Sequence, residues 1–157
     1  MQNGEIEIVA EGGIVVVDNV VLNAWHTAYS YSAAEALERA LSRAEQAHRG
    51  KLCALGVYRF RRLRPSDLPD AATRLLLQKV ANAHAYRCVV TVLDTPGLFT
   101  TTIRLFAAGL VSMSKMPNAV ADSIDEGIGL LGAAGCDVAV VEPVLRRLVD
   151  RVFTPSV

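Results

Sequence analysis

The stretch SYSAAEALERALSRAEQAHRGKLCALGVYRF, residues 30–60, joins an amphipathic helix to an apolar strand and indicates the fold class of the chain. Small and apolar residues recur at helical spacing and form one stripe, made of Ala33, Leu37, Ala40, Leu41 and Ala44. Ser32 is the expected N-cap, with Glu35 three residues later as its capping-box partner, and Gly50 is the expected stop. The apolar run KLCALGVYRF that follows is typical of a core strand. A helix that leads into a buried strand favours parallel pairing.

The same alternation continues on both sides of this stretch. GEIEIVAEGGIVVVDN, residues 4–19, predicts a β-hairpin with a glycine turn, and VVLNAW, residues 20–25, is either a third short strand or a crossing segment. PSDLPDAATRLLLQKVANAHAY predicts a second helix that starts after Pro69, and RCVVTVL predicts another buried strand. PGLFTTTIRLFAAGLVSMSKM, residues 96–116, predicts a third helix, which is apolar on nearly all sides.

The carboxyl-terminal part of the chain predicts two further helices. A short helix is expected to begin near Ser123, with Glu126 as its capping-box partner. VAVVEPVLRRLVDRVF, residues 138–153, predicts a short strand or turn followed by a helix with its charged residues outward. No helix or strand is predicted for the segment after residue 153.

The composition fits one globular domain. The chain has 157 residues, of which 52% are hydrophobic and 20% are charged, an ordinary balance for a chain with a real core. Strands that alternate with helices, after an antiparallel hairpin, predict a mixed α/β sheet of about four to five strands with helices packed on it. We expect a single domain over 1–157, with a core at about 5–132 and a C-terminal helical extension at 136–157.

Charge, cysteine content and hydropathy exclude several function classes. Sixteen basic residues balance sixteen acidic ones, so no nucleic-acid partner is expected. Cys53, Cys88 and Cys136 are far apart in sequence, which argues against a disulfide framework and against a zinc site. We expect them to be small core residues in a reducing, cytoplasmic compartment. The amino terminus lacks a secretory pattern, and the apolar segment 98–113 is too short and too polar to predict a membrane span.

The string DTPG, residues 94–97, has the D-x-x-G form that senses magnesium and the terminal phosphate in GTPases. That chemistry needs a glycine-rich loop that ends in Lys followed by Ser or Thr, and no lysine of this chain is followed by either. An N-K-x-D motif for base recognition is also absent. A strand-to-helix turn is the simpler interpretation, with Asp94 or Thr95 as the helix cap and the proline in its first turn.

The run YRFRRLRPSD, residues 58–67, is the most basic part of the chain, through Arg59, Arg61, Arg62 and Arg64. In an α/β sheet, ligands bind at the carboxyl ends of strands, and arginines there could hold a phosphate or an acidic partner. The alternative is a solvated loop with its two apolar residues turned inward. The three histidines are scattered and no serine lies in a nucleophile motif, so we predict no catalytic residue, metal or cofactor.

Several of these stretches together resemble the STAS superfamily, the fold of bacterial anti-sigma-factor antagonists, and especially its divergent single-domain members. They are IEIVAEGGIVVV, SAAEALERALSRAE, LCALGVYRFRRLRPSD, CVVTVLD, TTTIRLFAAGLVSMSKM and VADSIDEGIGLL, which cover about residues 5–132. The resemblance implies a regulatory serine at a helix start, whose phosphorylation by a serine kinase breaks partner binding. Ser66 holds the matching position, but Pro65 and Asp67 depart from the Asp-Ser-Ser-Gly pattern of the family.

The function implied by this resemblance is non-enzymatic: a protein-interaction module in bacterial regulation or signalling, with a regulatory protein as partner. We expect two contact surfaces. One is the arginine loop, Arg59 to Ser66, and the other is the apolar helix predicted at 96–116, through Leu98, Phe99, Ile103, Phe106 and Leu110. A helix apolar on nearly all sides also predicts a homo-oligomer. A small-ligand sensor that binds an anion or a lipid is the alternative, and an enzyme or a GTP-binding protein is the third option.

Overall fold

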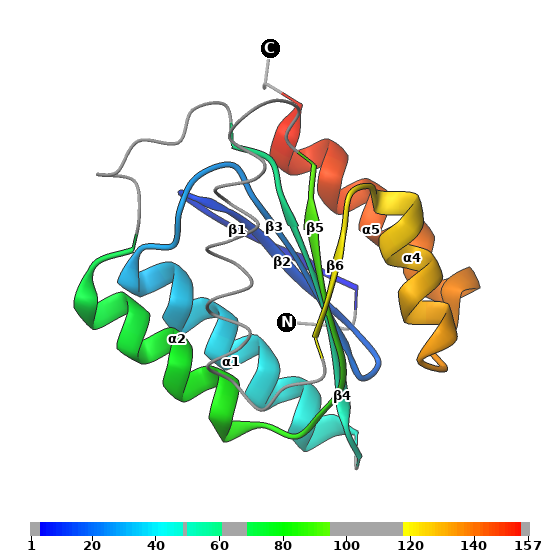
Figure 1. Ribbon diagram of the computed structural model, residues 1–157, viewed down its shortest axis with the longest axis horizontal. Coiled ribbons are helices and arrows are strands. Elements are labelled where there is room, and N and C mark those ends of the chain that lie inside the picture. The colour runs from blue at the N-terminus through cyan, green and yellow to red at the C-terminus, as the bar shows by residue number, and fades with distance from the viewer. Residues whose placement is uncertain (1–3, 49, 61–68, 95–117, 155–157) are drawn as a thin grey trace.

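The computed structural model describes residues 4–48, 50–60, 69–94 and 118–154. Within these ranges a six-stranded sheet carries helices on both of its faces (Figure 1). The strands are β1 (Ile6–Val9), β2 (Gly12–Val17), β3 (Val20–Trp25), β4 (Leu52–Tyr58), β5 (Tyr86–Leu93) and β6 (Asn118–Ala121). The helices are α1 (Tyr31–Ala47), α2 (Ala71–Ala83), α4 (Ile124–Ala133) and α5 (Val138–Phe153).

The strands lie in the sheet in the order in which they occur in the chain. β1, β2 and β3 pair antiparallel, whereas β3, β4, β5 and β6 pair parallel. The prediction of a mixed sheet is therefore confirmed, but the predicted count of four to five strands was wrong. The sixth strand, β6, was missed because it has only four residues and its Val120 is partly exposed, so it shows no clear alternation.

Helix α1 begins one residue after Ser30, so Ser30 and not Ser32 is its N-cap. The Ser30 Oγ accepts a hydrogen bond from the N–H of Ala33 at 3.1 Å. The earlier start places Ala33 and Ala34, both fully buried, in the first turn, where they pack against the sheet. The helix ends at Ala47 rather than running up to the predicted glycine stop.

Helix α4 begins as predicted, with the Ser123 Oγ accepting the N–H of Glu126 at 3.1 Å. Helix α5, in contrast, is helical from Val138 onward, where a strand or turn was expected first. Pro143 lies inside α5 and removes one backbone donor, but the helix continues because its apolar side buries against the sheet. The segment predicted as an extension thus supplies Leu145 and three other buried residues to the core.

The core forms two clusters, one on each face of the sheet. The cluster under α4 and α5 includes Leu22, Leu55, Val90, Leu131, Leu145 and Leu148. The cluster under α1 includes Ile14, Val21, Trp25, Leu41 and Leu52. Gly12 pairs with Trp25 at a point where β3 leaves no room for a side chain on β2, since a Cβ on Gly12 would lie 1.9 Å from the carbonyl oxygen of Ala24.

Candidate functional site

Arg59 and Asp94 lie side by side where two neighbouring parallel strands end. Arg59 directly follows β4 and Asp94 directly follows β5, whose last paired residues are Tyr58 and Leu93. The Nε–H of Arg59 donates to Oδ2 of Asp94 at 3.1 Å, and Nη2 contacts the same oxygen. The N–H of Asp94 donates to the carbonyl of Tyr58 at 3.0 Å, which continues the strand pairing by one residue. The carboxylate of the D-x-x-G string is thus engaged by an arginine of the neighbouring strand end.

Phe153, the last residue of α5, packs on the same arginine. The guanidinium carbon of Arg59 lies 4.6 Å from the centre of the Phe153 ring, within the range of a cation–π interaction. The side chain of Arg59 is 41% exposed and that of Asp94 is 33% exposed. Ion pairs with this exposure contribute at most about 1 kcal/mol to stability. Their clearer effect is geometrical, because Arg59 joins the ends of β4, β5 and α5.

A buried polar network lies next to this pair, on the face covered by α1. Oδ1 of Asn23 accepts hydrogen bonds from Trp25 Nε1 at 2.6 Å and from the Tyr29 hydroxyl at 3.5 Å. The hydroxyls of Tyr29 and Tyr58 share a hydrogen bond of 2.8 Å. Burial raises the pKa of both tyrosines, so both stay neutral. Gly56 leaves room for the amide, since a Cβ there would lie 2.6 Å from Asn23 Oδ1.

Asn23 was not predicted as a site residue, although the sequence held a signal for it. A single amide in the apolar strand VVLNAW needs a buried hydrogen-bond partner. Its partners come from the strand itself and from the segment before α1, and the second of these, Tyr29, also bonds to Tyr58 at the end of β4. The network therefore gives the strand ends beside Arg59 a fixed arrangement.

Most of the residues predicted to make contacts lie outside the described ranges. They are Arg61, Arg62, Arg64, Ser66, Leu98, Phe99, Ile103, Phe106 and Leu110. Of the predicted contact residues, Arg59 lies within these ranges. Chain connectivity fixes where the two remaining segments start, because residues 61–68 follow Phe60 and residues 95–117 follow Asp94. Both predicted contact segments therefore start from neighbouring strand ends.

His84, the C-cap of α2, contacts two carboxylates of α1. Its Nδ1 lies 2.6 Å from Oε2 of Glu45, and its Nε2 lies 2.9 Å from Oε2 of Glu38. An ionised carboxylate only accepts hydrogen bonds, so both ring nitrogens donate and the imidazole is charged. Burial opposes this charge, but the hydrogen bonds and charges of Glu45 and Glu38 outweigh burial and raise the pKa of His84. Tyr86 packs edge-on against the ring, and the two carboxylate contacts make this histidine a link between α2 and α1.

Stability that depends on His84 is expected to decrease as the pH rises. Because the pKa of His84 is higher in the folded state, its contribution is complete below the ordinary histidine pKa of about 6.5 and is lost through the higher folded-state pKa. Urea unfolding of the wild type and of His84→Gln, measured from about pH 5.5 to pH 9, should show a difference that shrinks toward high pH. His26→Gln, at an exposed position, is the control and should show no such trend. A constant difference for His84→Gln would contradict the charged state.

A hollow of about 690 Å³ lies between β1 and α1 and contains none of the predicted site residues. Glu7 pairs across it with Arg39 at 3.6 Å and with Arg43 at 3.7 Å, so both arginines that line the hollow have a carboxylate of the chain beside them. In the described part of the chain, no three His, Cys, Asp or Glu side chains are arranged to hold a metal ion. None of the described helices combines the length and the apolar character needed to cross a membrane.

Comparison of the chain with protein-family models, with curated proteins and with solved structures gave no match in any of the three.

Proposed function

We propose that the protein is a non-enzymatic, STAS-like interaction module in bacterial regulation, which binds a partner protein at the carboxyl ends of β4 and β5. The Arg59–Asp94 pair supports this proposal, because it joins the two strand ends and remains partly exposed. The arginine-rich residues 61–68 and the apolar residues 95–117 continue from these ends. Two segments with the composition of a contact surface thus begin at the carboxyl ends of two neighbouring strands.

The chemistry of these segments indicates the kind of partner. The charge of Arg59 is balanced within the chain by Asp94. Arg61, Arg62 and Arg64 carry three further positive charges close by in sequence. Arginine pairs well with carboxylates and with phosphorylated side chains, so the proposed partner presents acidic groups beside an apolar patch. The proposal includes self-association through the apolar residues of 98–110.

Charge reversal at Arg61 and Arg62 is expected to abolish partner binding. The Arg61→Glu, Arg62→Glu double variant replaces two positive charges with negative ones, which repel an acidic partner. Affinity capture from cells that express each tagged form should recover a protein with the wild type that the double variant loses. Binding should also weaken with added salt, because it depends on exposed charges.

Arg147→Glu, Arg151→Glu is the matched control, since both residues are exposed on α5 and the change in net charge is the same. The control should retain the partner. Equal capture by both double variants would contradict the arginine loop as a contact surface. A small-molecule adduct in the native mass spectrum of the wild type would favour the ligand sensor instead, if the Arg61→Glu, Arg62→Glu variant loses the adduct and the control variant keeps it. Stoichiometric GTP binding by the purified protein would exclude the proposed function.

A further inference from the structure

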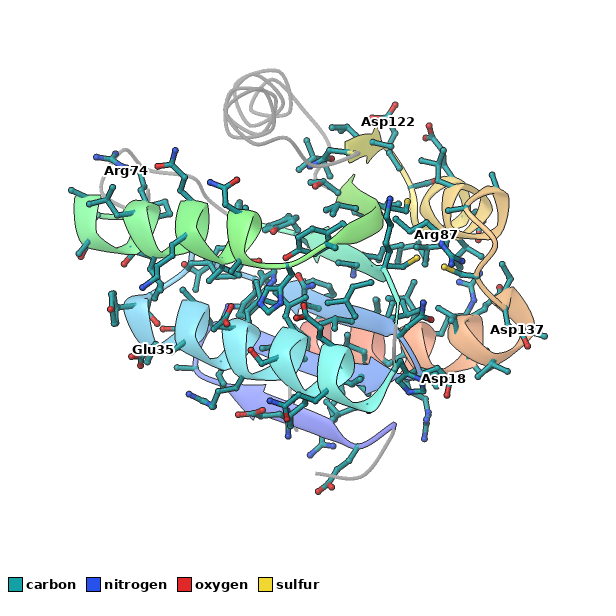
Figure 2. All side chains as sticks on the ribbon, turned by 90° about the horizontal axis from the view of Figure 1, so that it is seen from below. Asp18, Glu35, Arg74, Arg87, Asp122 and Asp137 are labelled. Atoms are coloured by element: carbon teal, nitrogen blue, oxygen red, sulfur yellow. The ribbon has the colours of Figure 1, made fainter. Side chains whose placement is uncertain are left out.

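The three cysteines, far apart in the sequence, gather between the sheet and the layer of α4 and α5. Cys53 in β4 and Cys88 in β5 are register partners of these adjacent strands. Cys136 lies in the turn between α4 and α5 and packs against the same core cluster. Figure 2 shows the sulfur atoms in yellow beside the labelled Arg87, and within the described ranges only these three residues carry sulfur. All three are free cysteines.

The turn that carries Cys136 has a defined backbone geometry. Gly135 has a φ of 90°, in the left-handed region that favours glycine. The N–H of Gly135 donates to the carbonyl of Gly132 at 3.0 Å, and the N–H of Cys136 donates to the carbonyl of Leu131 at 3.0 Å. These are the two hydrogen bonds of a Schellman motif, which turns the residue after the glycine back against its helix. The main chain therefore holds Cys136 in place against the core.

Cys136 lies close to Cys53, because it packs against the core cluster that contains Cys53 and its thiol is one of the groups that raise the pKa of the Cys53 thiol. Cys53 is fully buried, and burial, followed by the nearby Cys136 thiol, raises the pKa of its thiol to about 12. Cys136 is only partly buried. A small oxidant from solvent therefore meets Cys136 first, while Cys53 remains a neutral thiol beside it.

Arg87 places a positive charge at the same turn. A Cβ built on Gly135 would lie 3.5 Å from Nη1 of Arg87, so the guanidinium lies against the residue before Cys136 (Figure 2). The charge of Arg87 also acts on the neighbouring Cys53, where it opposes the rise in pKa caused by burial. The turn thus combines a partly buried thiol, a neighbouring cation and a second thiol in the same core cluster.

We propose that Cys136 and Cys53 form a reversible disulfide when the protein meets a peroxide. The Cys136 thiolate attacks an oxygen of hydrogen peroxide, the O–O bond breaks, and the released hydroxide and the thiol proton form water. The Cys53 sulfur then attacks the sulfenic sulfur of Cys136, the S–O bond breaks, and the leaving hydroxide takes the Cys53 proton to form a second water. Two thiols lose two electrons in total, and one peroxide is reduced to two waters. A dithiol reductant reverses the reaction by thiol–disulfide exchange.

The disulfide ties the turn between α4 and α5 to β4. A cross-link between residues 53 and 136 closes a long loop, and such cross-links restrict the unfolded chain strongly. The oxidised protein should therefore unfold at a higher urea concentration than the reduced protein. It should also hold the layer of α4 and α5 firmly on the sheet, which makes this layer the element that responds to oxidation.

Peptide mapping of the full chain tests the proposal directly, because trypsin places each cysteine in a separate peptide. Cleavage after Lys and Arg gives peptides 52–59, 88–104 and 116–146, with Cys53, Cys88 and Cys136 respectively. After treatment with hydrogen peroxide and alkylation of the remaining thiols, peptide 52–59 should be linked to peptide 116–146. The link should disappear with dithiothreitol, and the urea midpoint should return to that of the reduced protein.

Cys88→Ala is the matched control and should still form the link, whereas Cys136→Ala should lose both the link and the shift in urea midpoint. A link between peptides 52–59 and 88–104 in the wild type would overturn the proposal. Oxidation that stops at a sulfinic acid on Cys136, or three thiols that stay alkylatable after peroxide, would also overturn it. Because mapping of the wild type decides the pairing, the result does not depend on whether a variant folds.

Discussion

Replacing Gly12 with alanine is expected to lower the free energy of unfolding by more than about 4 kcal/mol, which few single substitutions do. A Cβ at this position would lie 1.9 Å from the carbonyl oxygen of Ala24 and 2.9 Å from Cε3 of Trp25. Trp25 is fully buried, and its indole N–H is bonded to Asn23, so the ring has no room to move away. Relief of the clash would require β2 to separate from β3, which would break the pairing in this part of the sheet.

Urea unfolding followed by circular dichroism measures this effect, and fluorescence of Trp25, the single tryptophan, reports on the affected contact. Gly129→Ala is the control, because it makes the same chemical change at an exposed position of α4. No heavy atom of the described chain lies within 4 Å of the new Cβ there, apart from its own helix surroundings. This control should gain roughly 0.5–1 kcal/mol, since alanine is the better helix former. A wild-type urea midpoint for Gly12→Ala would refute the close approach of the two strands.

Replacing Leu145 with alanine is expected to lower the free energy of unfolding by about 2–5 kcal/mol. Leu145 is fully buried on the side of α5 that packs against the sheet. Its truncation removes apolar contacts and leaves a cavity that its neighbours, including Leu148 and Val141, fill only in part. A loss of this size would establish that α5 belongs to the core of the domain.

The matched control is Val140→Ala on the same helix, where the side chain is 43% exposed. Its effect should stay within about 0.5 kcal/mol of the wild type, as for other surface substitutions. Both variants can be compared by urea unfolding under the conditions used for Gly12. Equal midpoints for the two variants would mean that α5 does not pack on the sheet as described.

Much of the architecture was predictable because most elements bury a regular pattern. The opening hairpin, α1, β4, β5 and α4 each combine an apolar period with a turn or capping signal, and the sheet is mixed as expected. The start of α5 was predicted wrongly because its valines and Pro143 locally resemble a strand or turn. Burial of Val141 and Leu145 against the sheet overrides that local preference, and a short sequence window does not contain this information.

The candidate site was less predictable because its contacts join distant parts of the chain. The arginine run and Asp94 were each noticed, but their ion pair spans 35 residues and depends on the parallel register of β4 and β5. Phe153 reaches the same arginine from the far end of the chain. The cysteines were expected to be small core residues, and the sequence did not indicate that the sheet and the turn after α4 bring them together. Contacts of this kind leave no periodic pattern in the sequence.

The sequential strand order bears on how the chain folds during synthesis. Among the six described strands, each one after β1 pairs with the strand that precedes it in the chain, so none of the six has to insert between two strands that are already paired. Helix α5 is the exception, because it is made after all the other described elements and packs on β2 and β3, which are made well before it. Until α5 leaves the ribosome, apolar residues such as Leu22 lack their final cover. A nascent chain that has not yet made α5 is therefore expected to be more prone to aggregation than one that has, and a premature stop before residue 138 would make that exposure permanent.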